Sequence, residues 1–270
     1  MNKKRWTILF ICSALLIILW FFRNHIRLFV FKNFPVAKSS VVKYSNADEG
    51  LFTVDIYTCQ RTYTGKIPTF VNKAFSDKLM VISWPLTGIK LNNLVLAPIG
   101  IDIISEKQLF YFNTLFFMSD YSPTTGLISE KVKISKKNPS KTRFGINDKG
   151  ELTIFKNGNN KVYEDVLQAQ FTFKQNSKGS KNFRTLNYRQ FVTIKNNSLI
   201  YISGYNNSLI SWTDVKELFL ILGVNYVIAL DGGASLDYCF KGKKINYQFS
   251  SIPLRNFYGK YNSPYYLEGR

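Results

Sequence analysis

The chain has 270 residues, of which 46% are hydrophobic and 16% aromatic, a composition typical of folded rather than disordered proteins. Its 36 basic and 17 acidic residues give a formal charge of +19, which suits a polyanionic partner but equally fits a solvated basic surface. The single histidine, His25, lies far in sequence from any other polar cluster. This excludes a Ser-His-Asp or Cys-His mechanism and a histidine-rich zinc site in the domain.

The N-terminal residues 6–22 carry no charge and follow three basic residues at 3–5, which predicts a membrane helix. No small-residue cleavage site follows, so an uncleaved anchor is favoured over a signal peptide. We therefore expect residues 1–40 to form a membrane anchor with a juxtamembrane segment and residues 41–270 to form one domain. The basic residues on the two sides are nearly balanced and leave the orientation open, although we expect a single-pass protein with an extracytoplasmic domain.

From about Val41 onward, short apolar runs alternate with turn residues, which is the pattern of β-strands. Two pairs of runs are separated by turn residues at 147–150 and 195–198, and each pair predicts a hairpin. The fold class we expect is α+β, with a mixed, largely antiparallel sheet and a few helices after one N-terminal transmembrane helix. The predicted strands include residues 52–57, 81–84, 109–112, 144–146, 152–155, 171–173, 191–194 and 199–202.

The clearest helix begins at Ser211, because Ser211 and Asp214 have the spacing of a capping box and apolar residues then recur at helical spacing up to position 222. Gly223 is placed to end this helix. Residues 226–230 form a continuous apolar run, short enough to be a buried strand. The sequence therefore predicts a helix and a buried strand that lead directly into a polar loop.

We expect the chemistry of the chain in that loop. An acidic residue, Asp231, is followed by Gly232, Gly233 and, two positions on, Ser235. Glycines let a backbone approach a ligand closely, and successive N–H groups can form an anion-binding concavity. The alternative is a tight turn with Asp231 as its hydrogen-bonding cap.

Two further segments carry candidate groups. Residues 113–127 follow a predicted strand and are rich in turn residues, so they form either part of a site or an ordinary surface loop. Arg189 stands at the start of a strand, where its guanidinium could bind a phosphate through two hydrogen bonds or lie on a sheet face. Cys59 and Cys239 could form one disulfide or remain two free thiols.

Together, these pieces resemble the phosphodiester glycosidase family. The resemblance covers roughly residue 41 to the C-terminus, and its most specific element is the Leu-Asp-Gly-Gly-x-Ser loop. The matching positions are Asn113 and Phe117, Asp120 to Pro123 with Gly126 and Leu127, Arg189, Leu222 with Gly223, and Leu230 to Gly233 with Ser235.

The resemblance implies hydrolysis of a sugar 1-phosphodiester in a glycan or glycoconjugate. Such a reaction needs a carboxylate beside an oxocarbenium-like centre, and groups that hold the departing phosphate. Asp231 is expected to be the base or nucleophile, with Asp120, or else Asp237, as the second carboxylate. The other expected site residues are Arg189, Gly232 and Gly233 for the phosphate, Asn113 for the sugar, and Tyr121 and Ser235 as further substrate contacts.

Two alternatives come from different classes of protein. Thr114 and Leu115 replace an expected Ala-Gly, and Gln168 stands in an altered mid-chain element, which favours a glycan-binding or exopolysaccharide-biosynthesis module that no longer cleaves. A nucleic-acid-binding protein is disfavoured, because no helix carries a concentrated basic face and no zinc-finger spacing exists. We expect no cofactor; there is no EF-hand-like spacing for calcium, although carboxylates and backbone oxygens could hold a structural ion. The oligomeric state is left open.

Overall fold

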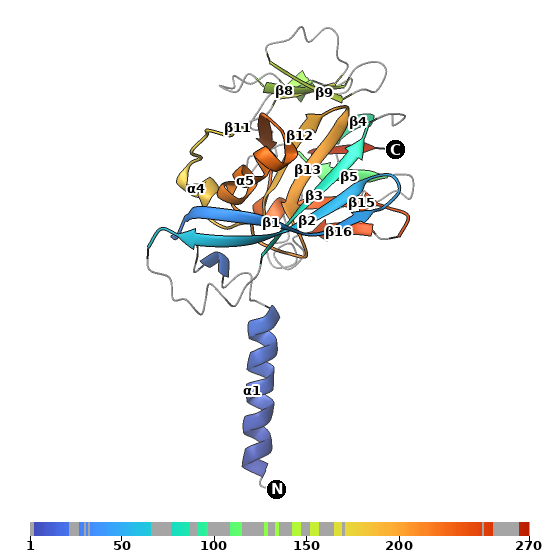
Figure 1. Cartoon of the computed structure of the whole chain (residues 1–270). Helices are drawn as coiled ribbons and strands as arrows, with labels where there is room; N and C mark the ends of the chain where they lie inside the picture. The colour runs from blue at the N-terminus through green and yellow to red at the C-terminus, as the bar shows by residue number, and fades with distance from the viewer. Residues whose placement is uncertain are drawn as a thin grey trace.

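The protein combines three β-sheets with few helices, as the computed structural model in Figure 1 shows. Every strand pairing among the described residues is antiparallel, so the predicted α+β class with largely antiparallel sheet is confirmed, but no mixed pairing accompanies it there. The structure describes residues 3–21, 27–29, 31, 33–65, 77–86, 91–96, 109–114, 127–128, 133–134, 142–146, 152–156, 165–168, 171–244, 246–250 and 265–269.

The N-terminal helix α1 (Lys3–Phe21) projects away from the sheets (Figure 1). It exposes large apolar side chains, among them Trp6 and Phe10. Within the described part of the chain, however, no helix combines the length and the apolar content that crossing a bilayer demands. The predicted transmembrane helix is therefore a helix, but its role as a membrane span is not supported.

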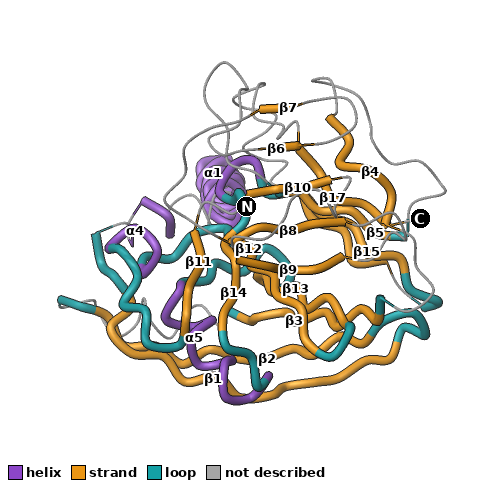
Figure 2. Tube along the Cα trace, turned by 90° about the horizontal axis from the view of Figure 1, so that it is seen from above, coloured by secondary structure: helices purple, strands orange, loops and turns teal. Residues whose placement is uncertain are grey.

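The largest sheet has seven strands in the order β1-β2-β3-β13-β12-β14-β11, and Figure 2 shows β12, β13, β3, β2 and β1 following one another across it. The predicted hairpin of β12 and β13 is confirmed: Lys195 pairs with Ser198, which leaves Asn196 and Asn197 as a two-residue turn. Both have positive φ, of 48° and 55°, which the twist of a tight hairpin requires and asparagine tolerates. The strands are β1 (Val36–Asp48), β2 (Thr53–Tyr63), β3 (Lys78–Pro85), β11 (Phe171–Lys174), β12 (Gln190–Lys195), β13 (Ser198–Gly204) and β14 (Tyr226–Ala229).

Helix α5 (Trp212–Leu222) covers one face of this sheet, because its buried residues pack against alternate strand residues such as Val81 and Ile202. Both predicted ends are confirmed: Ser211 and Asp214 form a capping box, and Gly223 ends the helix with φ 59° in the left-handed region. The single-turn helix α4 (Lys181–Arg184) is capped by Ser180, whose side chain accepts a hydrogen bond from the Phe183 N–H. After α5, the chain returns to the sheet as β14, which lies between β12 and β11.

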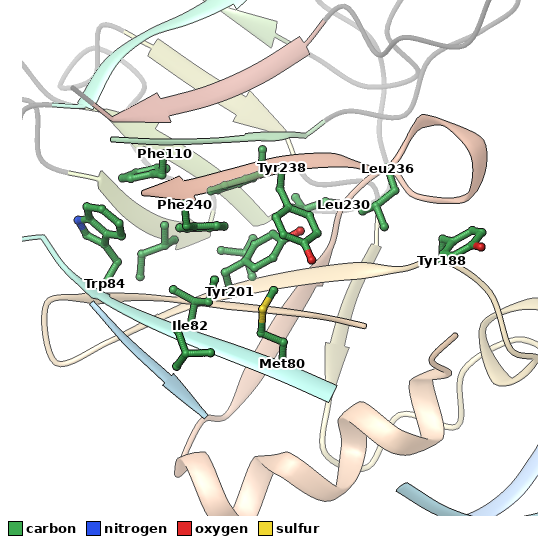
Figure 3. Close-up of a cluster of buried hydrophobic side chains, with 14 of the residues drawn as sticks. Met80, Ile82, Trp84, Phe110, Tyr188, Tyr201, Leu230, Leu236, Tyr238 and Phe240 are labelled. Carbon is green, nitrogen blue, oxygen red and sulfur yellow. The ribbon is translucent and has the colours of Figure 1, made fainter. Parts of the chain in front are cut away.

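The opposite face packs against a five-stranded sheet of order β16-β15-β5-β17-β4. Between them lies an aromatic core in which Trp84 of β3 is 4.9 Å from Phe110 of β5, and Tyr201 of β13 is 5.0 Å from Phe240 of β15, measured between ring centroids (Figure 3). Burial of such side chains is the main stabilising contribution. The strands are β4 (Leu91–Leu96), β5 (Phe110–Asn113), β15 (Asp237–Lys241), β16 (Asn246–Ser250) and β17 (Tyr265–Gly269).

The third sheet lies at the end of the molecule opposite α1 (Figure 1) and has the order β7-β6-β10-β8-β9. Its β8 and β9 form the other predicted hairpin, in which Ile146 pairs with Leu152, while the turn between them lies outside the described residues. The strands are β6 (Leu127–Ile128), β7 (Lys133–Ile134), β8 (Thr142–Ile146), β9 (Leu152–Lys156) and β10 (Asp165–Gln168).

A buried ionic network fixes the segment before β1 to the domain. Arg27 Nη1 donates to Asp77 Oδ1 at 2.8 Å, Arg61 also pairs with Asp77, and Arg61 Nε donates to Asp214 Oδ1 at 2.7 Å. Burial alone would raise the pKa of Asp77, but the two guanidinium groups offset this and hold it below its usual value. Arg27, within the segment expected to be juxtamembrane, is thus buried by its contact with the domain.

The two domain cysteines lie in different sheets, Cys59 in β2 and Cys239 in β15. Both are free thiols in the structure. Burial raises the pKa of each above its usual value, which makes both poor nucleophiles. Of the two alternatives left open by the sequence, the structure has two free thiols.

Candidate functional site

The polar loop connects β14 of the seven-stranded sheet to β15 of the five-stranded sheet. Leu230 and Leu236, on either side of it, are buried in the aromatic core (Figure 3), so both ends of the loop are anchored. Within it, Gly233–Ser235 forms one turn of 3₁₀ helix, η2. Asp231 therefore directly follows an anchored residue, Leu230, at the start of the loop.

Gly232 and Gly233 each have a steric reason to be glycine. A Cβ on Gly232 would lie 2.6 Å from the Tyr188 carbonyl oxygen, and Gly233 has φ +68°. The Gly233 N–H donates to the Tyr188 carbonyl at 2.8 Å. The glycines thus let the loop lie against the chain that enters β12, and this N–H is directed to the protein rather than to a ligand.

The main chain of Asp231 is held on both sides. Its N–H donates to the Thr114 carbonyl at 3.0 Å, while its carbonyl accepts from Asn113 Nδ2 at 3.3 Å and from Gln190 Nε2. Tyr201, on β13, donates its hydroxyl to Gln190 Oε1 at 2.8 Å. Segments distant in sequence therefore meet at the main chain of Asp231.

The Asp231 side chain is only 7% exposed. Burial raises the pKa of its carboxyl from 3.8 to about 7, while hydrogen bonds from the Ser235 hydroxyl and the Gly232 N–H limit the rise. The Ser235 bond, from Oγ to Oδ2, is 2.6 Å long. A carboxyl with a pKa near neutrality can both take up and release a proton, as acid–base chemistry requires.

Asp237, the alternative second carboxylate, is the first residue of β15 and is 6% exposed. Its N–H donates to Asn113 Oδ1 at 3.0 Å, and Tyr111 donates to its Oδ1 at 3.5 Å. Asn113 links it to Asp231 through one amide group. Asp120 and Tyr121 lie outside the described residues, so their predicted roles stay predictions.

Asn113 is fully buried, with an exposed fraction of 0%, and both ends of its side-chain amide make hydrogen bonds within the protein. It belongs to the support of the loop. A contact between this amide and a sugar would require these bonds to break. The predicted sugar contact stays a prediction.

Arg189 has its main chain beside the loop and its side chain elsewhere. Its Cα is 3.3 Å from a Cβ built on Gly232, but its guanidinium donates to the carbonyls of Asn182 and Thr185 and stacks over Phe183, 4.9 Å from the ring centroid. Burial lowers the pKa of Arg189 to about 10. The guanidinium is thus directed to α4, and phosphate binding by it stays a prediction.

Gln190 is the residue at this site that sequence reasoning missed. It is fully buried and donates to Asp231 and Asn113. The available signal was an amide at the start of an otherwise apolar strand, on the same face as Val192, where a buried polar group needs partners. Among the described residues, no group of three or more histidine, cysteine or acidic side chains could hold a metal ion.

Comparisons with known proteins identify a similar fold and no family. No protein-family model matches the chain, and no curated protein matches its sequence. A hypothetical protein from Synechocystis has a matching crystal structure, with a TM-score of 0.50 and 10% identity over 79% of this chain and 61% of that one. The catalytic domain of zebrafish N-acetylglucosamine-1-phosphodiester alpha-N-acetylglucosaminidase, auto-inhibited by its pro-peptide, matches with a TM-score of 0.48 and 13% identity, over 76% of this chain and 78% of that one. At such identities, the chain is similar to the Synechocystis protein in fold alone.

Proposed function

We propose that the chain is a hydrolase that cleaves the bond between a sugar and phosphate in a phosphorylated glycan or glycoconjugate, with Asp231 as the base or nucleophile. The proposal rests on the sequence resemblance to the phosphodiester glycosidase family. The observation that carries it is the buried Asp231 carboxyl, whose pKa of about 7 suits proton transfer and whose main chain is held by Asn113, Thr114 and Gln190.

In the proposed reaction, the bond between the anomeric carbon and the phosphate oxygen breaks and water supplies the new oxygen. Asp231 either removes a proton from that water or attacks the anomeric carbon itself, and the phosphate leaves with the bonding electrons. Asp120 or Asp237 is the second carboxylate of this proposal. Arg189 can help to hold the phosphate only if its guanidinium leaves the carbonyls of α4.

The test is hydrolysis of a panel of sugar 1-phosphodiesters by the purified protein and by Asp231→Asn. Loss of a general base lowers kcat by roughly 10²- to 10⁴-fold. Asp55→Asn is the matched control, because Asp55 of β2 forms a partly exposed pair with Lys43 of β1 away from the loop, and this variant should keep full turnover. Equal turnover by Asp231→Asn, or release of no sugar by the wild-type protein from any of the panel, would refute the proposal.

A glycan-binding module without turnover is the second candidate. It is favoured by the sequence at two elements of the resemblance, where Thr114 and Leu115 replace an expected Ala-Gly and Gln168 stands in an altered mid-chain element. Calorimetric titration with the same phosphodiesters separates the two functions. Binding that persists in the wild-type protein without any product points to this candidate.

A further inference from the structure

The Ser235 hydroxyl lies between two acceptors. Its oxygen is 2.6 Å from Asp231 Oδ2 and 2.9 Å from the Gly232 carbonyl oxygen, and both distances fit a hydrogen bond. A serine hydroxyl has one proton to donate. While Asp231 is ionised, the Ser235 hydroxyl therefore donates its proton either to the carboxylate or to the Gly232 carbonyl. The bond to the charged carboxylate is the stronger of the two.

Protonation of Asp231 changes which bonds are available. The carboxylic O–H at Oδ2 can donate to Ser235 Oγ, and the Ser235 proton is then free to point at the Gly232 carbonyl. No proton leaves Ser235 in this change, because only the directions of the two bonds are exchanged. In each protonation state, Asp231 Oδ2 thus keeps Ser235 Oγ as a hydrogen-bond partner within the same loop.

The loop is fixed well enough for this geometry to persist. Gly232 lies against the Tyr188 carbonyl, Gly233 donates to that carbonyl, and Leu236 is buried in the core. Titratable groups on the segments around the loop include Tyr188 and Arg189 just before β12, Tyr111 of β5, Tyr201 of β13, and Asp237, Tyr238 and Cys239 of β15. Of these, Arg189 directs its charge to α4.

We propose that Ser235 is a positioning residue that holds the Asp231 carboxyl in both protonation states by reversing its hydrogen bonds, rather than a substrate contact. Its relevance to catalysis rests on the proposed function of Asp231, but the exchange itself does not. The direction of the effect on acidity follows: Ser235 stabilises the ionised form more than the neutral one, and so lowers the pKa of Asp231.

The experiment is an NMR titration of the Asp231 carboxyl carbon in the full chain, with the signal assigned by its loss in Asp231→Asn. Removing the hydroxyl in Ser235→Ala should raise the pKa of Asp231 by roughly one pH unit, because the hydrogen bond to the ionised carboxylate is stronger than the bond to the neutral acid. Ser235→Thr keeps the hydroxyl and should restore the wild-type value. An unchanged or lowered pKa in Ser235→Ala would overturn the proposal.

Two further variants control for folding and for general effects. Ser235→Cys keeps the side-chain size but has only a weak donor, so it should also raise the pKa of Asp231, and it provides the test if Ser235→Ala does not fold. Ser203→Ala removes another buried hydroxyl, one that donates to the Arg189 carbonyl at 3.0 Å, and should leave the pKa of Asp231 unchanged. Because the titration needs no turnover, a protein that cleaves nothing would refute the proposed function and leave this inference standing.

Discussion

The side-chain amides of Gln190 and Asn113 meet at the main-chain carbonyl of Asp231. Gln190 Nε2 donates to that carbonyl, to Asn113 Oδ1 and, at 2.9 Å, to the Asn113 carbonyl oxygen. The Tyr201 hydroxyl donates to Gln190 Oε1, which fixes the end of the amide that faces Asp231. Because β5 and β12 belong to different sheets, this pair joins the sheets at the point where the acidic loop begins.

Gln190→Glu is expected to destabilise the protein strongly at neutral pH. The substitution keeps the shape but puts an oxygen where the amide faces acceptors on Asn113 and Asp231, so a buried charge would have no donors there. We expect a loss of about 3 kcal/mol in the free energy of unfolding, partly recovered in acid where the new carboxyl is protonated. Urea unfolding at pH 5 and pH 8 measures this.

The exposed Gln60 of β2 provides the matched control for that substitution. Gln60→Glu adds the same charge at the surface and should change the free energy of unfolding by no more than about 0.5 kcal/mol. A Gln190→Glu protein as stable as Gln60→Glu would mean that the amide is not the donor that joins the two sheets.

Arg189→Lys is expected to loosen α4 without changing Asp231. Lysine cannot reach two carbonyls with a planar group or stack on Phe183 in the same way, so the turn between Asn182 and Thr185 loses its cross-link. Hydrogen exchange of the α4 amides should accelerate, whereas the NMR-measured pKa of Asp231 should stay within about 0.3 of the wild-type value. Arg184→Lys, on the same turn, is the control.

A phosphate ligand that slows exchange of the α4 amides in the wild-type protein but not in Arg189→Lys would instead support the predicted phosphate contact of Arg189.

What the sequence could predict was set by local patterns. Helix α5 has its start signal, its apolar spacing and its glycine end within thirteen residues, 211 to 223, so its bounds were predictable. The turn at Asn196 and Asn197 is equally local. The Asp231 loop was found because an acid, two glycines and a serine follow a buried strand.

The remaining features depend on contacts between distant residues. The role of Gln190 comes from Asn113, 77 positions away, and no local pattern encodes that pairing. The contacts of the Arg189 guanidinium depend on α4, a single turn with too little sequence to predict. The burial of Arg27 required knowledge that Asp77, 50 positions later, would lie beside it.

Asp77→Asn is expected to be among the most destabilising single substitutions in the chain. Asp77 pairs with both Arg27 and Arg61, and the loss of its charge would remove one ionic partner from each of these two buried guanidinium groups. Breaking a buried pair typically costs about 3–5 kcal/mol. Thermal or urea unfolding near pH 7 measures the loss. Asp55→Asn, which breaks the exposed pair with Lys43, should cost no more than about 1 kcal/mol, and similar losses in both variants would contradict this account.

Asp231 should reduce the stability of the protein as the pH rises. Its pKa is raised from 3.8 to about 7 on folding, so between these values the folded state binds more protons than the unfolded one, and the free energy of unfolding falls with increasing pH. The full effect is up to about 4 kcal/mol and is complete above pH 7. Asparagine cannot ionise, and Asp231→Asn should therefore be more stable than wild type at pH 8, with the difference in the free energy of unfolding shrinking toward pH 4.

Urea unfolding of both proteins from pH 4 to pH 8 measures this difference directly, because the other titrating groups cancel in the comparison. A difference that stays constant, or that grows toward acid, would show that the carboxyl is not held in its neutral form by burial, and the acid–base role proposed for it would lose its physical basis.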